Sequence, residues 1–242
     1  MGTGALVPDS GPIRRRKLYE HVVERLEAAI HEGLYAPGDQ LPAERELMEA
    51  YGVGRTAVRE ALFALQRMGL IAISSGERAR VSQPSAGTMI GELSGMARHL
   101  LAQPGGAQHF QQARLLFEVG VARLAAQSAT PDDVTRLRAA LEANHRAIGQ
   151  ERSFERSDVA FHYALAEISR NPIFTALHSG LTEWLTEQRS TSLRARGAAE
   201  AAYAAHERIF HAVAAGDADA AGRAMHDHLL EVGDFYWKVS NI

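Results

Sequence analysis

The feature that most restricts the fold of this chain is a continuous series of helical patterns between residues 93 and 238. Apolar residues recur at spacings of three and four, and short breaks occur at 104–106, 129–133, 170–172 and 215–217. Pro, Gly and Asp in these breaks are typical of the positions where helices end and begin. No strand-like alternation occurs between them. We therefore expect an all-helical bundle of about 150 residues, which is a usual size for one domain.

The first part of the chain carries a different pattern, three helices followed by two short strands. Helical spacing runs over residues 18–30, 43–51 and 56–68, and the glycine-containing turn YGVGRT joins the second and third helices. The segments LIAIS and ARVSQ then flank the glycine turn SGER, which predicts a β-hairpin. Helix–turn–helix followed by a hairpin, in about 65 residues, is the outline of a winged helix.

These patterns give a mainly α fold in four segments. Residues 1–13 are rich in Gly, Pro and Ser, which predicts a disordered tail. The winged helix is expected at 14–82, a linker at 83–92 and the helical domain at 93–238.

Composition excludes several classes of protein. The chain contains no cysteine, so a disulfide scaffold, a thiol nucleophile and a thiolate metal site are excluded. No apolar run is long enough for a secretion signal or a membrane span, and we expect a cytoplasmic protein with no membrane partner. The net charge of −3 gives no overall case for nucleic-acid binding. Any such function must depend on where the charges lie.

Basic and polar residues gather around the turn before the third predicted helix. The N-terminal part of a recognition helix reaches base edges, and Arg can hydrogen-bond guanine through two donors. Residues 14–17 are placed to meet phosphates, which fix register without reading sequence. Solvation of helix faces is the competing interpretation, but few matching acids lie on this face. The candidates for DNA contact are Arg45, Arg55, Thr56 and Arg59, with Arg78 beside the hairpin.

A second group of candidates lies on three predicted helices of the bundle. Asp158 and His162 are one helical turn apart, so their side chains share a face. In AAHERIFHAV and RAMHDHLLEV the helical period lets only one histidine of each pair face the core, and the apolar neighbours favour His206 and His228. One carboxylate and three imidazoles suit Zn²⁺, Ni²⁺ or Mn²⁺, with positions open for a small ligand. Alternatively, these are core polar residues that satisfy one another, because separate helices need not meet.

The run PGDQLPAERELMEAYGVGRTAVREALFALQRMGLI closely resembles the DNA-binding domain of the GntR family of bacterial transcription regulators, and the resemblance covers residues 18–82. It implies that Arg45, Arg55, Thr56 and Arg59 contact DNA and that Gly76, in the wing tip, touches the minor groove. Some relatives carry a basic residue directly after this glycine. Here Glu77 stands at that position, so Arg78 is expected to make the wing contact.

Residues 93–235 resemble the FCD effector domain found in the FadR branch of that family. The resemblance rests on RLLFEVGVARLAA, on SDVAFH, on RNPIF, on the segment from His206 to Asp217 and on a final Met-x-x-His. In metal-binding members these motifs supply one Asp and three His, which correspond here to Asp158, His162, His206 and His228.

Further pocket residues follow from the same resemblance. Arg114 matches a family arginine that helps to bind acidic effectors. Asn144 and Asn171 are additional effector-binding candidates, although either could equally be a helix cap. His109, His145 and His178 receive no role.

The resemblance implies a homodimeric repressor of a catabolic operon. It would bind a double-stranded DNA operator and respond to a sialic acid, a sugar acid or another carboxylate at a divalent metal site, most simply zinc. A metal-dependent hydrolytic enzyme is one alternative, but no general base is evident beside the four ligands, and Glu167 lies off their face. The second alternative is a regulator whose metal is purely structural or is itself the signal.

Overall fold

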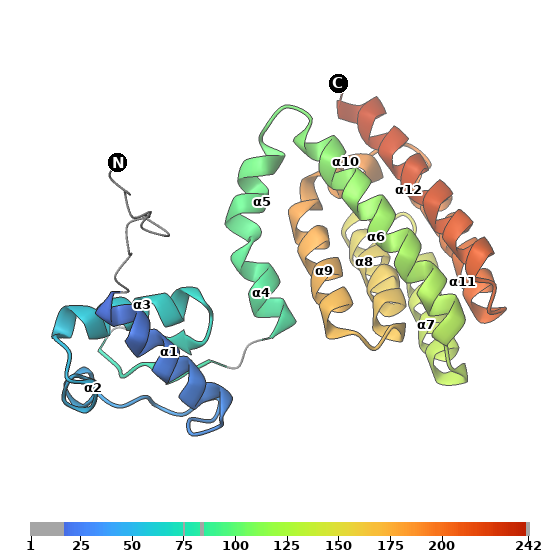
Figure 1. Ribbon diagram of the computed structural model, residues 1–242. Coiled ribbons are helices and arrows are strands. Elements are labelled where there is room, and N and C mark those ends of the chain that lie inside the picture. Colours follow the sequence, from blue (N-terminus) through green and yellow to red (C-terminus); the bar gives the residue numbers. More distant parts are fainter. Residues whose placement is uncertain (1–16, 75, 83–84, 241–242) are drawn as a thin grey trace, which may run out of the picture. The chain divides into compact units, whose positions relative to one another are not determined.

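The computed structural model describes residues 17–74, 76–82 and 85–240 (Figure 1). The tail expected at 1–13 and the arginines at 14–16 lie outside the described residues. The chain divides into two compact units, residues 1–84 and 85–242. Mainly helical architecture is confirmed for both. None of the helices within the described ranges has both the length and the apolar run needed to cross a bilayer.

The first unit is a winged helix, as the pattern predicted. Its elements are α1 (Leu18–His31), α2 (Glu44–Tyr51), α3 (Arg55–Arg67), β1 (Ile71–Ala72) and β2 (Arg80–Val81). The two strands pair antiparallel, with Ile71 opposite Val81. Leu26, Val58 and Leu65 are fully buried where α1 packs on α3. This small core fixes α3 with its N-terminal end exposed.

Two glycines shape the turns of this unit. Gly52 ends α2 with φ +63°, a left-handed conformation that side chains rarely adopt, and the chain then turns into α3. Gly76 has φ +80° in the turn between the strands. The side chain of Arg80 donates to the carbonyl oxygen of Gly38 at 2.7 Å, which ties β2 to the loop after α1.

The second unit contains helices only, among the residues described. They are α4 (Ala86–Glu92), α5 (Ser94–Leu101), α6 (Gly106–Ser128), α7 (Pro131–Arg146), α8 (Glu151–Ile168), α9 (Pro172–Trp184), α10 (Thr186–Leu193), α11 (Ala198–Ala214) and α12 (Ala218–Ser240). The long helix α12 packs against α6, α11 and α10, while α8 packs against α6, α7 and α9 (Figure 1). The four predicted breaks coincide with ends of these helices. The breaks at 147–150, at Leu185 and at 194–197 were not predicted.

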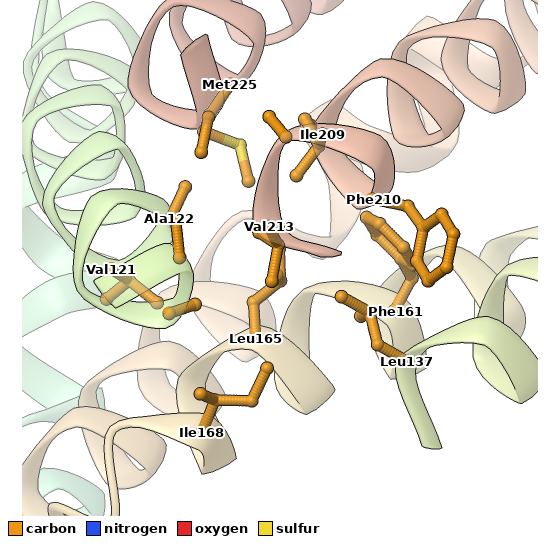
Figure 2. Close-up of a cluster of buried hydrophobic side chains, with 14 of the residues drawn as sticks. Val121, Ala122, Leu137, Phe161, Leu165, Ile168, Ile209, Phe210, Val213 and Met225 are labelled. Carbon is orange, nitrogen blue, oxygen red and sulfur yellow. The ribbon is translucent and has the colours of Figure 1, made fainter. Parts of the chain in front are cut away.

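One apolar core joins the helices that carry the candidate metal ligands. Phe161 and Leu165 on α8 meet Ile209 and Phe210 on α11 and Met225 on α12, and all five are at most 2% exposed (Figure 2). On α6 the core residues are mostly small, Val121, Ala122 and Ala125 among them. Small side chains let neighbouring helices approach closely, and this brings polar groups from different helices within contact distance.

Most of the expected linker at 83–92 is helical. Ser85 caps α4 by accepting a hydrogen bond from the backbone N–H of Thr88 at 3.0 Å, and Ile90 is buried. Ile90 lies against α9 at Gly180, where an added Cβ would come within 2.4 Å of its methyl group. The Gly- and Ser-rich composition favours a loop, but this tertiary contact gives the segment a partner, so α4 belongs to the second unit.

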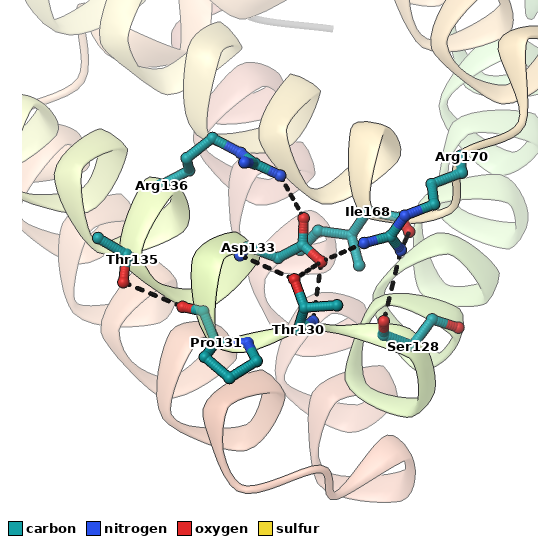
Figure 3. A network of polar contacts seen from close by, with 8 residues as sticks. All are labelled: Ser128, Thr130, Pro131, Asp133, Thr135, Arg136, Ile168 and Arg170. Atoms are coloured by element: carbon teal, nitrogen blue, oxygen red, sulfur yellow. Dashed lines mark hydrogen bonds and ion pairs between the residues drawn. The ribbon is translucent and has the colours of Figure 1, made fainter.

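A polar network fixes the corner where α6, α7 and α8 end or begin (Figure 3). The buried carboxylate of Asp133 accepts from the Thr130 backbone N–H at 2.8 Å and from its hydroxyl at 2.6 Å. Arg170 donates to the same carboxylate at 2.6 Å and to the carbonyl oxygen of Ile168 at 2.9 Å. Arg136 makes a further ion pair with Asp133. Arg170 holds this position with φ +53°, which is unusual for a residue other than glycine.

Candidate functional site

Four side chains from three helices converge in the core of the second unit. Asp158 and His162 come from α8, His206 from α11 and His228 from α12, and one ligand atom of each lies within 4.8 Å of the others. All four residues are buried, with exposures of 6%, 2%, 0% and 1%. The neighbouring histidines 211 and 226 are exposed, as the helical period predicted.

A hydrogen-bond chain fixes the orientation of His206. The hydroxyl of Ser157 donates to the carbonyl oxygen of Phe154 at 2.9 Å, so it accepts from Nδ2 of Asn144 at 3.0 Å. The remaining amide oxygen of Asn144 lies 2.9 Å from Nδ1 of His206 and must accept its proton. Nε2 of the neutral His206 ring therefore presents a lone pair to the other ligands.

Glu118 plays the same part for His162. Its carboxylate hydrogen-bonds Nδ1 of His162 and accepts from Nε of Arg114 at 2.5 Å. Burial alone would raise the pKa of Glu118, but Arg114 and His162 outweigh that effect and hold the pKa well below its usual range. An ionised Glu118 accepts a hydrogen bond from Nδ1 of His162, so Nε2 of this ring faces the cluster.

The donor set fits a divalent metal ion. Nε2 of His162 lies 3.2 Å from Nε2 of His206 and 3.3 Å from Nε2 of His228. Nitrogens bound tetrahedrally to zinc at about 2.0–2.1 Å would lie roughly 3.3 Å apart. Burial and then the neighbouring histidines hold the pKa of His206 and of His228 well below its usual range, which favours the neutral, metal-binding rings. The ring nitrogens therefore already lie at the spacing that one shared cation would require.

A small cavity of about 10 Å³ adjoins the cluster, and a second cavity of about 20 Å³ shares part of its lining. The smaller is lined by Asp158, His228 and Ser192, the larger by Gln111, Gln188 and Tyr236, among others. Both are bordered by Arg114, Arg189 and Val232. Each has room for about one water molecule.

The other predicted pocket residues occupy different places. Arg114 borders both cavities and also donates to Glu118. Asn144 lines neither cavity and instead orients His206. Asn171 caps α9, since its side chain accepts from the backbone N–H of Ile173 at 3.0 Å.

Sequence reasoning missed three residues of this site. Glu118 carries a signal, because it stands four residues after Arg114 in an otherwise apolar helical stretch. Arg189 stands in the polar helix α10, where nothing marks it as buried. His178, which received no role, is 3% exposed and its ring centroid lies 6.4 Å from that of His162. Burial lowers the pKa of His178 to about 4, so this ring is neutral near pH 7.

The candidate DNA-contacting residues of the first unit are all exposed: Arg45, Arg55, Thr56, Arg59, Gly76 and Arg78. A groove between α3 and the hairpin is lined by Arg59, Gly76 and Arg78, among others. The guanidinium of Arg45 pairs with Glu49 at 3.1 Å. Arg59 lies 3.7 Å from Glu44. Such exposed pairs contribute little free energy, so both arginines can exchange them for phosphates or bases.

Comparison with known proteins identifies both units. Residues 18–81 match the model of the bacterial regulatory proteins of the gntR family, and residues 110–231 match the FCD domain. The chain is 49% identical over 223 residues to the HTH-type transcriptional repressor NanR of Enterobacter sp. (strain 638), covering 91% of this chain and 86% of that protein. The chain belongs to the GntR family. NanR of Escherichia coli (strain K12) is 48% identical over 227 residues, 92% of this chain and 86% of the relative.

Two solved structures share the fold of this chain. Streptococcus agalactiae GntR superposes with a TM-score of 0.61 at 24% identity, covering 88% of this chain and 98% of that one. E. coli McbR/YncC gives 0.51 at 17% identity, with 93% and 99% covered. GntR/FCD proteins are transcription regulators, so the alternative of a metal-dependent enzyme is not supported. Glu118 is the obvious candidate for a catalytic base. Its carboxylate already hydrogen-bonds Nδ1 of His162, on the side of the ring turned away from the cluster.

Proposed function

We propose that this protein is a dimeric transcriptional repressor that releases its operator when a small carboxylate binds the helical unit. The observation that carries the proposal is the buried cluster of Asp158, His162, His206 and His228, whose rings are oriented by Asn144 and Glu118. The identity with the NanR repressors supports repression. It also extends across the run SSGERARVSQPSAGTMIGELSGMARHLLAQPGGAQHF, which resembles NanR, a regulator of sialic acid breakdown.

The four residues would hold a divalent ion, most simply zinc, which supplies positive charge and open coordination positions for a carboxylate oxygen. The chain's own residues prepare this site. Asn144 and Glu118 set the imidazole tautomers, and Arg114 keeps Glu118 ionised. Because the adjoining cavities have room for about one water molecule each, a sugar acid enters only if the surrounding helices move apart. That movement is the change that the DNA-binding unit would sense.

The first unit would bind one half of a palindromic or repeated operator. The exposed N-terminal end of α3 presents Arg55, Thr56 and Arg59 to the major groove, and Arg45 lies on α2 where it can meet a phosphate. Gly76 and Arg78 in the hairpin turn provide the wing contact. Two copies of the chain would supply the two half-site contacts.

The proposal is tested by fluorescence anisotropy on an operator duplex selected from random DNA. Zinc-loaded full-length protein is titrated with N-acetylneuraminate, D-gluconate, L-lactate and propionate. We expect at least one acid to weaken operator binding, and His206→Ala to bind DNA but to lose this response. His211→Ala, an exposed histidine on the same helix, is the control and should respond like the wild type. The proposal fails if no acid changes operator affinity, or if His206→Ala responds normally.

A further inference from the structure

Arg189 is a buried cation that the proposed function does not use. It lies on α10, is 6% exposed and borders both cavities, the smaller of which adjoins the candidate metal cluster. A buried charge is costly unless it is paired and hydrogen-bonded. The partners of Arg189 therefore indicate whether its role is structural or is completed by a ligand.

The structure gives Arg189 few partners. Nη2 donates to the carbonyl oxygen of Thr182 at 2.9 Å and lies 3.4 Å from the hydroxyl of Thr186. Nε is buried and has no hydrogen-bond partner. Glu155 forms an ion pair with Arg189, but its Oε1 lies 3.6 Å from Nε, which is too long for a hydrogen bond. Within the described part of the chain, no carboxylate accepts a hydrogen bond from Arg189.

Arg114, on the other side of the same cavities, is in the opposite situation. Its Nε donates to Glu118 at 2.5 Å. Burial acts to lower the pKa of Arg114, but Glu118 outweighs it and the pKa is raised. For Arg189, burial and the charge of Arg114 outweigh the attraction of Asp158, and the pKa is lowered. Arg114 is thus stabilised by its own acid, whereas Arg189 is a cation whose charge is only partly compensated.

The proposed metal would further increase the positive charge around Arg189. Among the buried charges around the cavities, Arg114 and Arg189 balance Glu118 and Asp158. A divalent ion bound by Asp158 adds two positive charges and takes the acid that attracts Arg189 most strongly. The loaded pocket then carries excess positive charge beside a guanidinium with a free Nε.

From this geometry we infer that Arg189 binds the carboxylate of the effector, while Arg114 acts as a positioning residue that holds Glu118 and, through it, His162. This inference rests on the proposed function, since it concerns the same pocket. It differs from the expectation that Arg114 is the arginine that binds the acidic ligand.

A second unpaired atom narrows the class of ligand. Oε1 of Gln188 is buried without a hydrogen-bond partner, and Gln188 lines the larger cavity next to Arg189. An amide oxygen needs a donor, which a carboxylate ligand supplies only if it also carries a hydroxyl or an amide N–H. Gln111 and Tyr236 line the same cavity. The pocket therefore selects hydroxy- or acylamino-carboxylates over simple alkyl carboxylates.

The test is a calorimetric titration of the zinc-loaded full-length protein. The probes are the best-binding acid of N-acetylneuraminate, D-gluconate and L-lactate, its neutral primary amide, and propionate. Hydrogen bonds to charged groups are worth about 1.5–3 kcal/mol, or roughly 10- to 150-fold in affinity. We expect Arg189→Gln to lose about that factor for the acid and to bind the amide as weakly as the wild type does. Propionate should bind at least about 10-fold more weakly than the hydroxy acid, since it leaves the Gln188 acceptor unpaired.

Three measurements separate binding from folding. Arg189→Lys keeps the charge and should recover part of the affinity. Arg194→Gln, at the exposed end of the same helix, should bind like the wild type. Zinc content should remain one ion per chain in every Arg189 variant. In Arg114→Gln, by contrast, zinc affinity should fall as well, because Glu118 loses its partner.

The outcomes distinguish the two proposals. If the wild type binds an acid and Arg189→Gln binds it equally well, the role of Arg189 is wrong and the proposed function stands. Equal losses for the acid and its amide also contradict a carboxylate contact at Arg189. If the zinc-loaded wild type binds none of the acids, the carboxylate effector and the inference on Arg189 are both wrong.

Discussion

At the scale of single residues, the side chains behind the histidines decide what the cluster can bind. Asn144 accepts a hydrogen bond from Nδ1 of His206, and Glu118 accepts one from Nδ1 of His162. Nε2 of each ring therefore faces the other candidate metal ligands. Removing such supporting groups typically lowers metal affinity by about 10- to 100-fold. The cluster is therefore a set of six or more residues, and only four of them are candidate ligands.

Glu118→Gln is expected to lower zinc affinity by about 10- to 100-fold, because the neutral amide is a weaker acceptor for the His162 proton and leaves Arg114 without its acid. Competition with a fluorescent zinc chelator measures the change. Glu167→Gln provides the matched control, since Glu167 is exposed on α8, the helix of Asp158 and His162. Equal zinc affinity in the two variants would contradict the role given to Glu118.

The sequence was sufficient to predict which four side chains converge, but not the residues that support them. The 3.6-residue period separates His206 from His211 on one helix, and the structure confirms that only the former is buried. The contact between Glu118 and His162 joins residues 44 positions apart, and no local pattern reports such a pair. Burial of Arg189 is equally hidden, because its helix has a polar composition.

At the scale of helices, turn composition predicted four breaks in the helical unit, but it did not predict the helix in the expected linker at 83–92. Pro or Gly marks the four predicted breaks from residue 104 onwards, and these match the structure, whereas the break at Leu185 contains neither residue. The segment from Ala86 to Glu92 contains two glycines, which favour a linker. It is helical because Ile90 packs against Gly180, where no side chain stands in the way. This contact depends on the position of α9 and cannot be seen in the local sequence. Tertiary contact outweighs local propensity here.

The corner built on Asp133 makes the acid stability of the helical unit predictable. Burial would raise the pKa of Asp133, but hydrogen bonds from Thr130 and the charge of Arg170 outweigh it and lower the pKa from 3.8 to about 2. A lowered pKa stabilises the fold above about pH 4, and this contribution is lost as the pH falls towards 2. The difference corresponds to about 2 kcal/mol.

Asp133→Asn should therefore lower the free energy of unfolding by about 2 kcal/mol at pH 7 and flatten its dependence on pH between about 4 and 2. Urea unfolding at a series of pH values, followed by circular dichroism, measures both effects. Asp132→Asn is the matched control, because Asp132 is an exposed residue in the same first turn of α7. Similar losses in the two variants would show that the corner network does not stabilise the fold.

At the scale of the whole molecule, each of the two units has its own main hydrophobic core, and these two cores share no residue. One is built by α1, α3 and the hairpin, and the other by α6, α7, α8, α11 and α12. The candidate metal ligands all belong to helices of the second core. Because a ligand that binds only the folded state stabilises the unit that holds it, metal should act on one unit and leave the other unchanged.

Both tryptophans of the chain, Trp184 and Trp237, lie in the helical unit, so their fluorescence reports its unfolding alone, while circular dichroism reports both units. With free zinc about 1,000-fold above its dissociation constant, the metal contributes about 4 kcal/mol. Chelation should therefore move the fluorescence transition to markedly lower temperature. The circular dichroism change that belongs to the DNA-binding unit should stay at the same temperature.

In His206→Ala the chelator should have no effect on either signal. A fluorescence transition that zinc does not shift in the wild type, or a chelator effect that persists in His206→Ala, would exclude these four residues as the site of a stabilising metal.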